Sequence, residues 1–202
     1  FFSPEVSRTE LAMRILSAEG KISMGRLKKG DLDTEGWTNL ATLQGRIDSA
    51  PLFIDDSPNM TLMEIRAKCR RLKQRNDLKL VVLDYLQLMS SGKKVESRQQ
   101  EVSEFSRSLK LLAKELDVPV IALSQLNRGS EQRTDKRPMV SDLRESGSIE
   151  QDADMVILLH REDMYNPDSE RVGEADMIIA KHRGGPTRTI PLAFSGKYSR
   201  FN

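Results

Sequence analysis

Two polar side chains directly follow runs of apolar residues, in positions where buried strands would end. Asp84 follows the apolar run from Leu80 to Leu83, and Gln125 closes a second run, "VPVIALSQ". In open α/β sheets, ligands bind outside the carboxyl ends of the strands. We therefore expect Asp84 and Gln125 to lie beside each other at a ligand site, provided that the two strands are neighbours.

Each of these two residues has a catalytic and a purely structural interpretation. Four apolar residues followed by aspartate form the pattern of a Walker B strand, whose acid holds Mg²⁺ beside nucleotide phosphates, often through water. Asp84 could instead hydrogen-bond the backbone of the following turn. The amide of Gln125 could contact a γ-phosphate or the attacking water, or it could satisfy buried backbone groups. The residues alone leave both alternatives open.

Three further charged residues occupy comparable positions. Glu5 follows two phenylalanines at an expected strand end, where its carboxylate could polarise an attacking water. Lys181 and Arg183 share one face of an expected strand, because alternate side chains point the same way. Two fixed cations before the Gly184–Gly185 turn could stabilise phosphoryl charge, as an arginine finger does. The alternative is a pair of solvated cations at a strand end.

A long polar segment, residues 127–150, is dense in arginine. Its string "SDLRESGSIEQDAD" combines Arg144 with the small residues Gly147 and Ser148, a composition suited to sequence-independent phosphate contacts. Cations upstream are expected to add positive potential. These are Arg128, Arg133, Lys136 and Arg137. The alternative is a mobile polar loop without a ligand.

The pattern of apolar residues predicts the elements that would position these side chains. Helices are expected at residues 7–22, 31–50, 61–77 and 98–117, and buried parallel strands at 78–85 and 118–125. The helix over 98–117 has the clearest buried stripe: Val102, Phe105, Leu109, Leu112 and Leu116.

The remaining predicted elements are strands. A short strand is expected at 51–56, and neighbouring strands are expected at 153–161, 174–183 and 187–195, the last two forming a hairpin. Strand–helix–strand units followed by a hairpin predict an α/β core with an antiparallel edge.

The composition is that of one globular domain with a substantial core. The chain has 202 residues, of which 38% are hydrophobic and 31% charged. Neither a signal peptide nor the roughly 18 consecutive apolar residues of a membrane span is present, so we expect no membrane contact. A single cysteine, Cys69, excludes an internal disulfide framework and favours a cytoplasmic setting. Because the chain starts at Phe1 without methionine, we expect it to be a fragment.

A family resemblance is carried by five strings in a fixed order: "VVLDYLQLM", "RQQEVSEFSRSLKLLAKEL", "VPVIALSQLNR", "DLRESGSIEQDAD" and "AKHRGGPT". Together they closely resemble the bacterial replicative DNA helicases, the DnaB family, over essentially the whole chain. The resemblance implies a RecA-like (P-loop NTPase) core with a mostly parallel sheet, flanking helices and antiparallel C-terminal strands. It also implies a homo-hexameric ring around single-stranded DNA, in which ATP hydrolysis drives 5′-to-3′ translocation at the replication fork. ATP and Mg²⁺, a primase and a helicase loader are the implied ligands and partners.

The resemblance also implies a role for each nucleotide-site residue. Glu5 resembles the family's catalytic glutamate, and Arg14 resembles a nucleotide-contacting arginine downstream of it. Asp84 resembles the Walker B acid, and Gln125 resembles the γ-phosphate sensor.

The other implied roles concern neighbouring subunits and DNA. Lys181 and Arg183 resemble the pair that reaches into the neighbouring subunit's nucleotide site. Arg144, Glu145 and Gly147 resemble the loop that follows the DNA backbone inside the ring.

The chain departs from the family pattern in two places. The family's "SLEM" is "SPEV" here, and Pro4 cannot donate a ladder hydrogen bond, so the strand must end early or lie at an edge. No G-x-x-x-x-G-K-[ST] string occurs in the 202 residues. We therefore expect residues 1–202 to form part of a motor domain whose phosphate-binding loop and N-terminal domain lie before Phe1, and to be inactive alone as an ATPase.

Two other functions are compatible with a RecA-like fold. One is a non-catalytic module that binds single-stranded DNA or replication partners. The other is a different RecA-family ATPase, such as a recombinase paralogue, against which the string "DLRESGSIEQDAD" argues.

Overall fold

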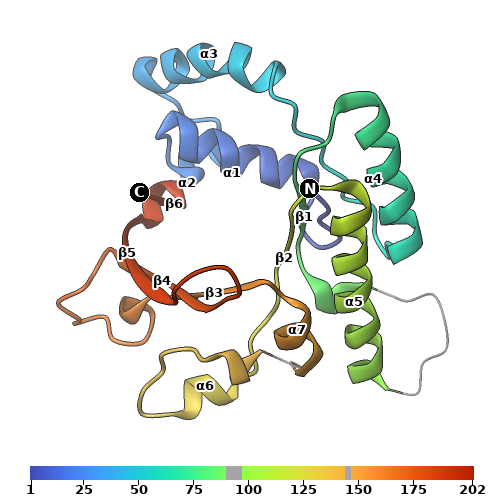
Figure 1. Cartoon of the computed structure of the whole chain (residues 1–202). Coiled ribbons are helices and arrows are strands. Elements are labelled where there is room, and N and C mark those ends of the chain that lie inside the picture. The colour runs from blue at the N-terminus through green and yellow to red at the C-terminus, as the bar shows by residue number, and fades with distance from the viewer. Residues whose placement is uncertain (90–96, 144–146) are drawn as a thin grey trace.

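Helices dominate the first part of the chain and strands the last part (Figure 1). The computed structural model describes residues 1–89, 97–143 and 147–202. The helices are α1 (Arg8–Gly20), α2 (Met24–Lys29), α3 (Thr34–Asp48), α4 (Leu62–Asn76), α5 (Arg98–Leu116), α6 (Gly129–Gln132) and α7 (Gly147–Asp152). The strands are β1 (Val81–Leu83), β2 (Val120–Ala122), β3 (Met155–His160), β4 (Glu174–His182), β5 (Arg188–Ser195) and β6 (Arg200–Phe201). Single 3₁₀ turns are η1 (Leu86–Leu88), η2 (Val140–Asp142), η3 (Glu162–Met164) and η4 (Gly196–Tyr198).

Side-chain caps set the starts of the long helices. Ser7, Asp33 and Ser97 each accept a hydrogen bond from the backbone N–H three residues further on. Thr61 and Glu64 form a capping box at the start of α4. The four predicted helices are thereby confirmed. The short helix α2 was not predicted, because six residues are too few to display an apolar period.

The first sheet is parallel and consists of β1 and β2. β1 and β2 pair in register, with Val81 beside Val120. Phe2 lies on the other side of β1, where it forms parallel bridges to both Leu83 and Asp55. The strand predicted at 51–56 is reduced to the bridge between Asp55 and Phe2. The N-terminal stretch that contains Phe2 ends at Pro4, so it offers no longer partner.

The second sheet is antiparallel, with the strand order β3-β4-β5-β6. β4 and β5 form the predicted hairpin, and β3 pairs with β4 as expected. The structure is therefore a mixed α/β fold with parallel strands at its core and antiparallel strands toward the C-terminus. In the part of the chain that the structure describes, no helix is both long and apolar enough to cross a membrane.

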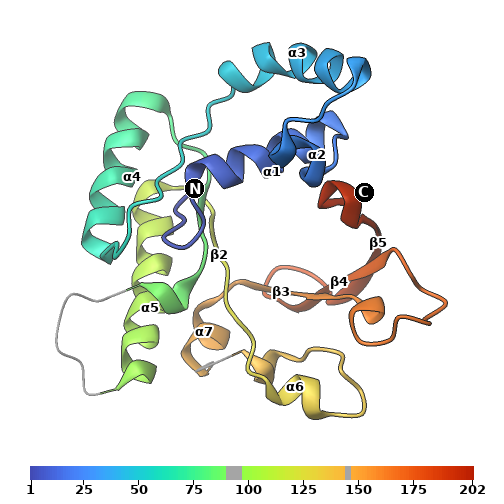
Figure 2. The same cartoon turned by 180° about the vertical axis from the view of Figure 1, so that it is seen from behind.

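The core is built around α5, which runs beside α4 and next to β1 and β2 (Figures 1 and 2). All five residues of its predicted stripe are buried. The same cluster contains Ile65 and Cys69 from α4, and Val156 and Leu158 from β3. One continuous core thus joins the parallel sheet, its helices and the first antiparallel strand.

The prediction that the strand at 118–125 is buried holds at its start, where Val118 belongs to the core, and is wrong further along. Ile121 is 49% exposed and Leu123 is 42% exposed, and Leu80, ahead of β1, is 45% exposed. Parallel strands are buried on both faces only when neighbouring elements cover them. In the described residues β2 pairs with β1 alone, so part of its apolar surface meets solvent.

Candidate functional site

The candidate site lies at the carboxyl end of β1, where a short turn carries Glu5 beside the strand. The backbone N–H of Asp84 donates to the carbonyl oxygen of Phe2 at 2.9 Å. After Ser3 the chain turns: the Ser3 hydroxyl donates to the Val6 carbonyl at 2.8 Å and accepts from the Val6 N–H at 3.3 Å. Of the two expectations raised by proline in "SPEV", an early strand end is confirmed.

Asp84, Glu5 and Arg14 are brought together by this arrangement. Burial raises the pKa of the Asp84 carboxyl above its usual range. The negative charge of Glu5 raises this pKa further, whereas the positive charge of Arg14 lowers it. Arg14 itself is held on α1 by Glu10, with Nη2 to Oε1 at 2.8 Å. The charges of Glu5 in the first turn and of Arg14 on α1 therefore both act on Asp84, the residue that follows β1.

The carboxylates of this site fit a magnesium ion as partial ligands. The negative charge of Glu5 raises the pKa of Asp84, and a bound cation would offset that repulsion. The described residues contain no group of three or more histidine, cysteine, aspartate or glutamate side chains able to hold a metal. Mg²⁺ is commonly held by one or two carboxylates, with water and substrate phosphates completing its octahedron. Asp84 is the residue that would hold it here.

Gln125 lies just beyond β2, beside the end of β1, as predicted from the two strands. The backbone N–H of Leu86 donates to the carbonyl oxygen of Leu123 at 3.0 Å, so the two chains stay adjacent past the last strand residues. Gln87, on η1, reaches across to this segment and hydrogen-bonds Ser124 and Gln125. Sequence reasoning missed Gln87 because one glutamine in a 3₁₀ turn has no periodicity. Its place within "VVLDYLQLM" was the available indication.

The side chains of Lys181 and Arg183, at the end of β4, contact the C-terminal end of α7. The Lys181 ammonium donates to the carbonyl oxygen of Glu150, and Arg183 Nη2 donates to that of Gln151 at 2.9 Å. Cations stabilise a helix C-terminus because its last carbonyl groups have no intrahelical partner. Both side chains lie on the same face of the strand, as predicted, and within this chain α7 packs against that face.

Two of the cations expected to add positive potential are neutralised by internal ion pairs. Arg133 binds Asp142 with two hydrogen bonds, at 2.6 and 2.7 Å. Arg137 donates to Asp176 on β4 at 2.7 Å and to Thr189 on β5 at 3.1 Å. The expectation is therefore corrected for Arg133 and Arg137, because buried carboxylates attract these guanidinium groups away from solvent.

The remaining residues of the 127–150 segment are placed in part. The ammonium of Lys136 lies 5.1 Å from the centre of the Tyr165 ring, and Arg128 is exposed. Gly147 is the first residue of α7 and is exposed. Arg144 and Glu145 lie outside the described residues.

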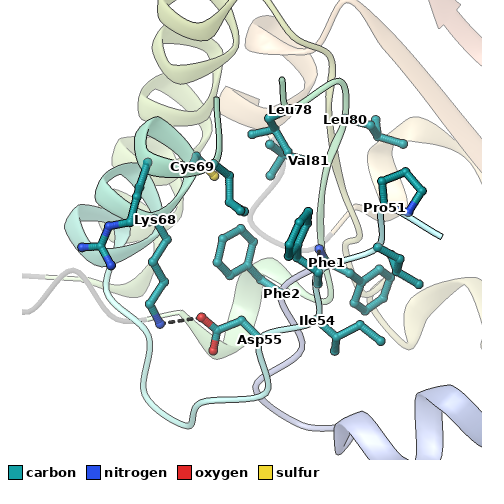
Figure 3. Close-up of a pocket in the computed structure, with 14 residues that line it drawn as sticks. Phe1, Phe2, Pro51, Ile54, Asp55, Lys68, Cys69, Leu78, Leu80 and Val81 are labelled. Carbon is teal, nitrogen blue, oxygen red and sulfur yellow. Dashed lines mark hydrogen bonds and ion pairs between the residues drawn. The ribbon is translucent and has the colours of Figure 1, made fainter. Parts of the chain in front are cut away.

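An apolar pocket of about 310 Å³ lies at the start of β1, between that strand, the first two residues, the stretch 51–55 and α4 (Figure 3). It contains none of the candidate site residues. The Lys68 ammonium and the Asp55 carboxylate, 2.5 Å apart, satisfy each other at its margin. Burial raises the pKa of the Cys69 thiol to about 11, so this cysteine is not an activated nucleophile. The residues that line the pocket include Phe1, Phe2, Pro51, Ile54, Asp55, Lys68, Cys69, Leu78, Leu80 and Val81.

Comparison with known proteins gives close relatives along the whole chain. The replicative DNA helicase DnaB of Leifsonia xyli subsp. xyli is 70% identical over 201 residues, which is 100% of this chain and 44% of that protein. The DnaB helicases of Mycobacterium intracellulare and Geobacillus stearothermophilus are 66% and 56% identical, over 99% of this chain and 35% and 44% of their own lengths. This chain therefore spans less than half the length of these curated relatives.

Solved structures show the same fold. A solved ATPase domain superposes with a TM-score of 0.94 at 43% identity, covering 99% of this chain and 72% of that one. A DnaB-like replicative helicase, described together with its interactions with primase, superposes with a TM-score of 0.95 at 43% identity, covering 99% and 49%. These neighbours confirm the predicted RecA-like α/β class.

The family model of the DnaB-like helicase C-terminal domain matches residues 1–202. The match covers the full sequence, and the DnaB helicase of Leifsonia xyli subsp. xyli is well above the identity that shows a shared family. The chain belongs to the DnaB-like helicase C-terminal domain family.

Proposed function

We propose that this chain is part of a hexameric replicative helicase motor that couples ATP hydrolysis to 5′-to-3′ movement along single-stranded DNA. The observation that carries the proposal is the interaction of Glu5 and Arg14 with Asp84 at the carboxyl end of β1, with Gln125 just beyond the neighbouring strand β2. This is the edge of an α/β sheet at which nucleotides bind. The family and the resemblance of the whole chain to DnaB helicases support the same interpretation.

In this proposal each side chain has one task in the attack of water on the γ-phosphate. Glu5 orients the attacking water and accepts its proton. Asp84 holds Mg²⁺, which when bound neutralises charge on the phosphate oxygens. Arg14 contacts the nucleotide, and the amide of Gln125 senses whether the γ-phosphate is present. The products are ADP and inorganic phosphate.

Lys181 and Arg183 would complete the site of a neighbouring subunit. Lys181 is the penultimate residue of β4 and Arg183 follows the strand; with their contacts to α7, Arg183 is exposed and Lys181 is half-buried in this chain. Cations held at a subunit boundary can stabilise the charge that develops on the transferred phosphoryl group. A homo-hexameric ring provides this geometry at every interface.

The proposal places DNA against the first residue of α7 and the residues just before it in the sequence. Arg144, Glu145 and Gly147 would follow the phosphate backbone without reading bases. α7 is anchored to α5 by a hydrogen bond between the Ser148 and Ser103 hydroxyls at 2.9 Å. A primase and a helicase loader complete the proposed set of partners, in the cytoplasmic replisome.

The experiment that tests the proposal mixes two inactive variants of the full-length protein. Glu5→Gln removes the base, and Lys181→Ala/Arg183→Ala removes the cations. Each alone should lower DNA-stimulated ATP turnover by about 100-fold or more. In mixed rings, a site that combines Glu5 of one subunit with the cations of its neighbour is intact, so turnover should partly return.

The matched control is Lys28→Ala/Lys29→Ala, which removes two exposed cations from α2 and should leave turnover unchanged. Absence of complementation would show that the cations do not act between subunits. Normal turnover by both variants would contradict the motor function and favour the non-catalytic module.

A further inference from the structure

The side chain of Gln87 bridges the ends of the two parallel strands. Its Oε1 accepts a hydrogen bond from the backbone N–H of Gln125 at 3.2 Å. Its Nε2 donates to the Ser124 hydroxyl at 2.9 Å and makes a longer contact, 3.5 Å, with the carbonyl oxygen of Gln125. One amide group thus engages both backbone polar groups of the residue that we propose as the γ-phosphate sensor.

Gln87 is itself held in place from α5. Arg98, the first residue of that helix, donates to the carbonyl oxygen of Gln87 at 2.6 Å and to that of Met89 at 3.1 Å. The guanidinium of Arg98 is paired with Glu101, which is buried. Arg98 therefore fixes the backbone of Gln87 to α5, the helix around which the core is built.

The side chain of Gln125 is left available by this arrangement. The residue is exposed, and in the described parts of the chain its hydrogen bonds are made by the backbone alone. β2 ends at Ala122, so the strand ladder no longer fixes the backbone of Gln125. Gln87 supplies the missing partners, in the manner of a further rung beyond the end of the sheet.

We propose that Gln87 is a positioning residue for ATP hydrolysis, acting through Gln125; the inference rests on the function proposed above. It fixes the main chain of Gln125, so the amide of Gln125 meets the γ-phosphate in one orientation. Displacement of a reacting or sensing group by about 1 Å can cost about 100-fold in rate, so loss of this anchor should be visible in turnover.

The test is a double-mutant cycle in the full-length protein with ATP, Mg²⁺ and single-stranded DNA. Gln87→Leu keeps the approximate size of the side chain and removes its hydrogen bonds. It should lower kcat about 10-fold and leave KM for ATP within about twofold, because orientation rather than ground-state binding is lost. Gln125→Ala should lower kcat more, by about 100-fold. In the Gln125→Ala background, Gln87→Leu should cost less than about twofold further, because its target is already gone.

Two control variants separate this effect from a loss of structure. Gln74→Leu alters an exposed glutamine of α4 and should change neither kcat nor KM. Ser124→Ala removes one partner of Gln87 but neither contact with Gln125, and should lower kcat less than about twofold. Melting temperatures of all variants show whether the fold is retained.

The outcomes distinguish the inference from the function on which it rests. If Gln125→Ala leaves kcat unchanged, the proposed sensor and the inference both fail. If Gln125→Ala is deleterious while Gln87→Leu is harmless, or if the two losses simply multiply, the sensor stands and the positioning role of Gln87 is overturned.

Discussion

At the scale of single residues, Asp84 occupies a position that disfavours its own charge. Burial and the neighbouring charge of Glu5 both raise its pKa, and the positive charge of Arg14 opposes them. A carboxyl whose pKa is higher in the folded than in the unfolded state lowers stability once the pH exceeds both values. Unfavourable charge of this kind is typical of residues retained for function rather than for folding.

Asp84→Asn should therefore stabilise the chain at pH 7, by no more than about 0.5 kcal/mol because solvent screens this partly exposed carboxylate. The gain should disappear as the pH falls below the usual range of an aspartate, because the carboxyl is then neutral in both states. Urea unfolding of the 202-residue chain at several pH values measures this difference. Asp168→Asn, at an exposed position, is the matched control, and a loss of stability in Asp84→Asn at pH 7 would contradict the account.

At the scale of elements, helix α5 is defined by its buried stripe. Leu112 is 2% exposed and its neighbour Leu111 is 58% exposed, although the two residues are chemically identical. Leu112→Ala should destabilise the chain by about 2–5 kcal/mol, since it leaves a cavity in the core. Leu111→Ala should change stability by less than about 0.5 kcal/mol. Similar losses in the two variants, measured by urea unfolding, would disprove this orientation of the helix.

Strand β4 is tied to the segment 127–143 through Asp176. Arg171 and Arg137 both donate to this buried carboxylate and hold its pKa at about 2. A lowered pKa contributes stability that is present above the usual aspartate range and is lost as the pH falls toward about 2.

Asp176→Asn should consequently destabilise the chain at pH 7 by about 2 kcal/mol. The difference from the unaltered chain should narrow between about pH 4 and pH 2. Thermal unfolding across this range tests the prediction, and a difference that is independent of pH would indicate that the charge of Asp176 is not the cause.

At the scale of the whole molecule, both sheets present apolar side chains to solvent. Ile121 and Leu123, in and just after β2, are exposed, as are Met155, Ile157 and Leu159 from β3. In β3 these residues alternate with Val156 and Leu158, which belong to the core. Exposed apolar surface of this kind marks places that other chain segments or partners cover.

The isolated 202-residue chain should therefore bind the dye ANS more strongly, per molecule, than the full-length protein does. Ile121→Thr/Leu123→Thr should lower this fluorescence. Val172→Thr, which alters one exposed valine outside the strands of both sheets, should leave it unchanged. Equal dye binding by the isolated chain and the full-length protein would show that these faces are also open in the whole protein.

Much of this protein was determined by the sequence itself, where the decisive interactions are local. Helix α5 follows from its apolar period and its cap at Ser97, and both act within a few residues. The hairpin of β4 and β5 follows from two apolar runs around Gly184–Gly185. Asp84 and Gln125 could be singled out because an apolar run that ends in a polar residue is a local feature.

Tertiary structure decided the contacts between distant segments. It brought Glu5 beside Asp84, directed Arg137 to a carboxylate 39 residues away, and placed Gln87 beside Gln125 across 38 residues. It also left Ile121 exposed, although its run of apolar neighbours predicted burial. Burial and ion pairing depend on which elements meet in space, and no local pattern of residues encodes that meeting.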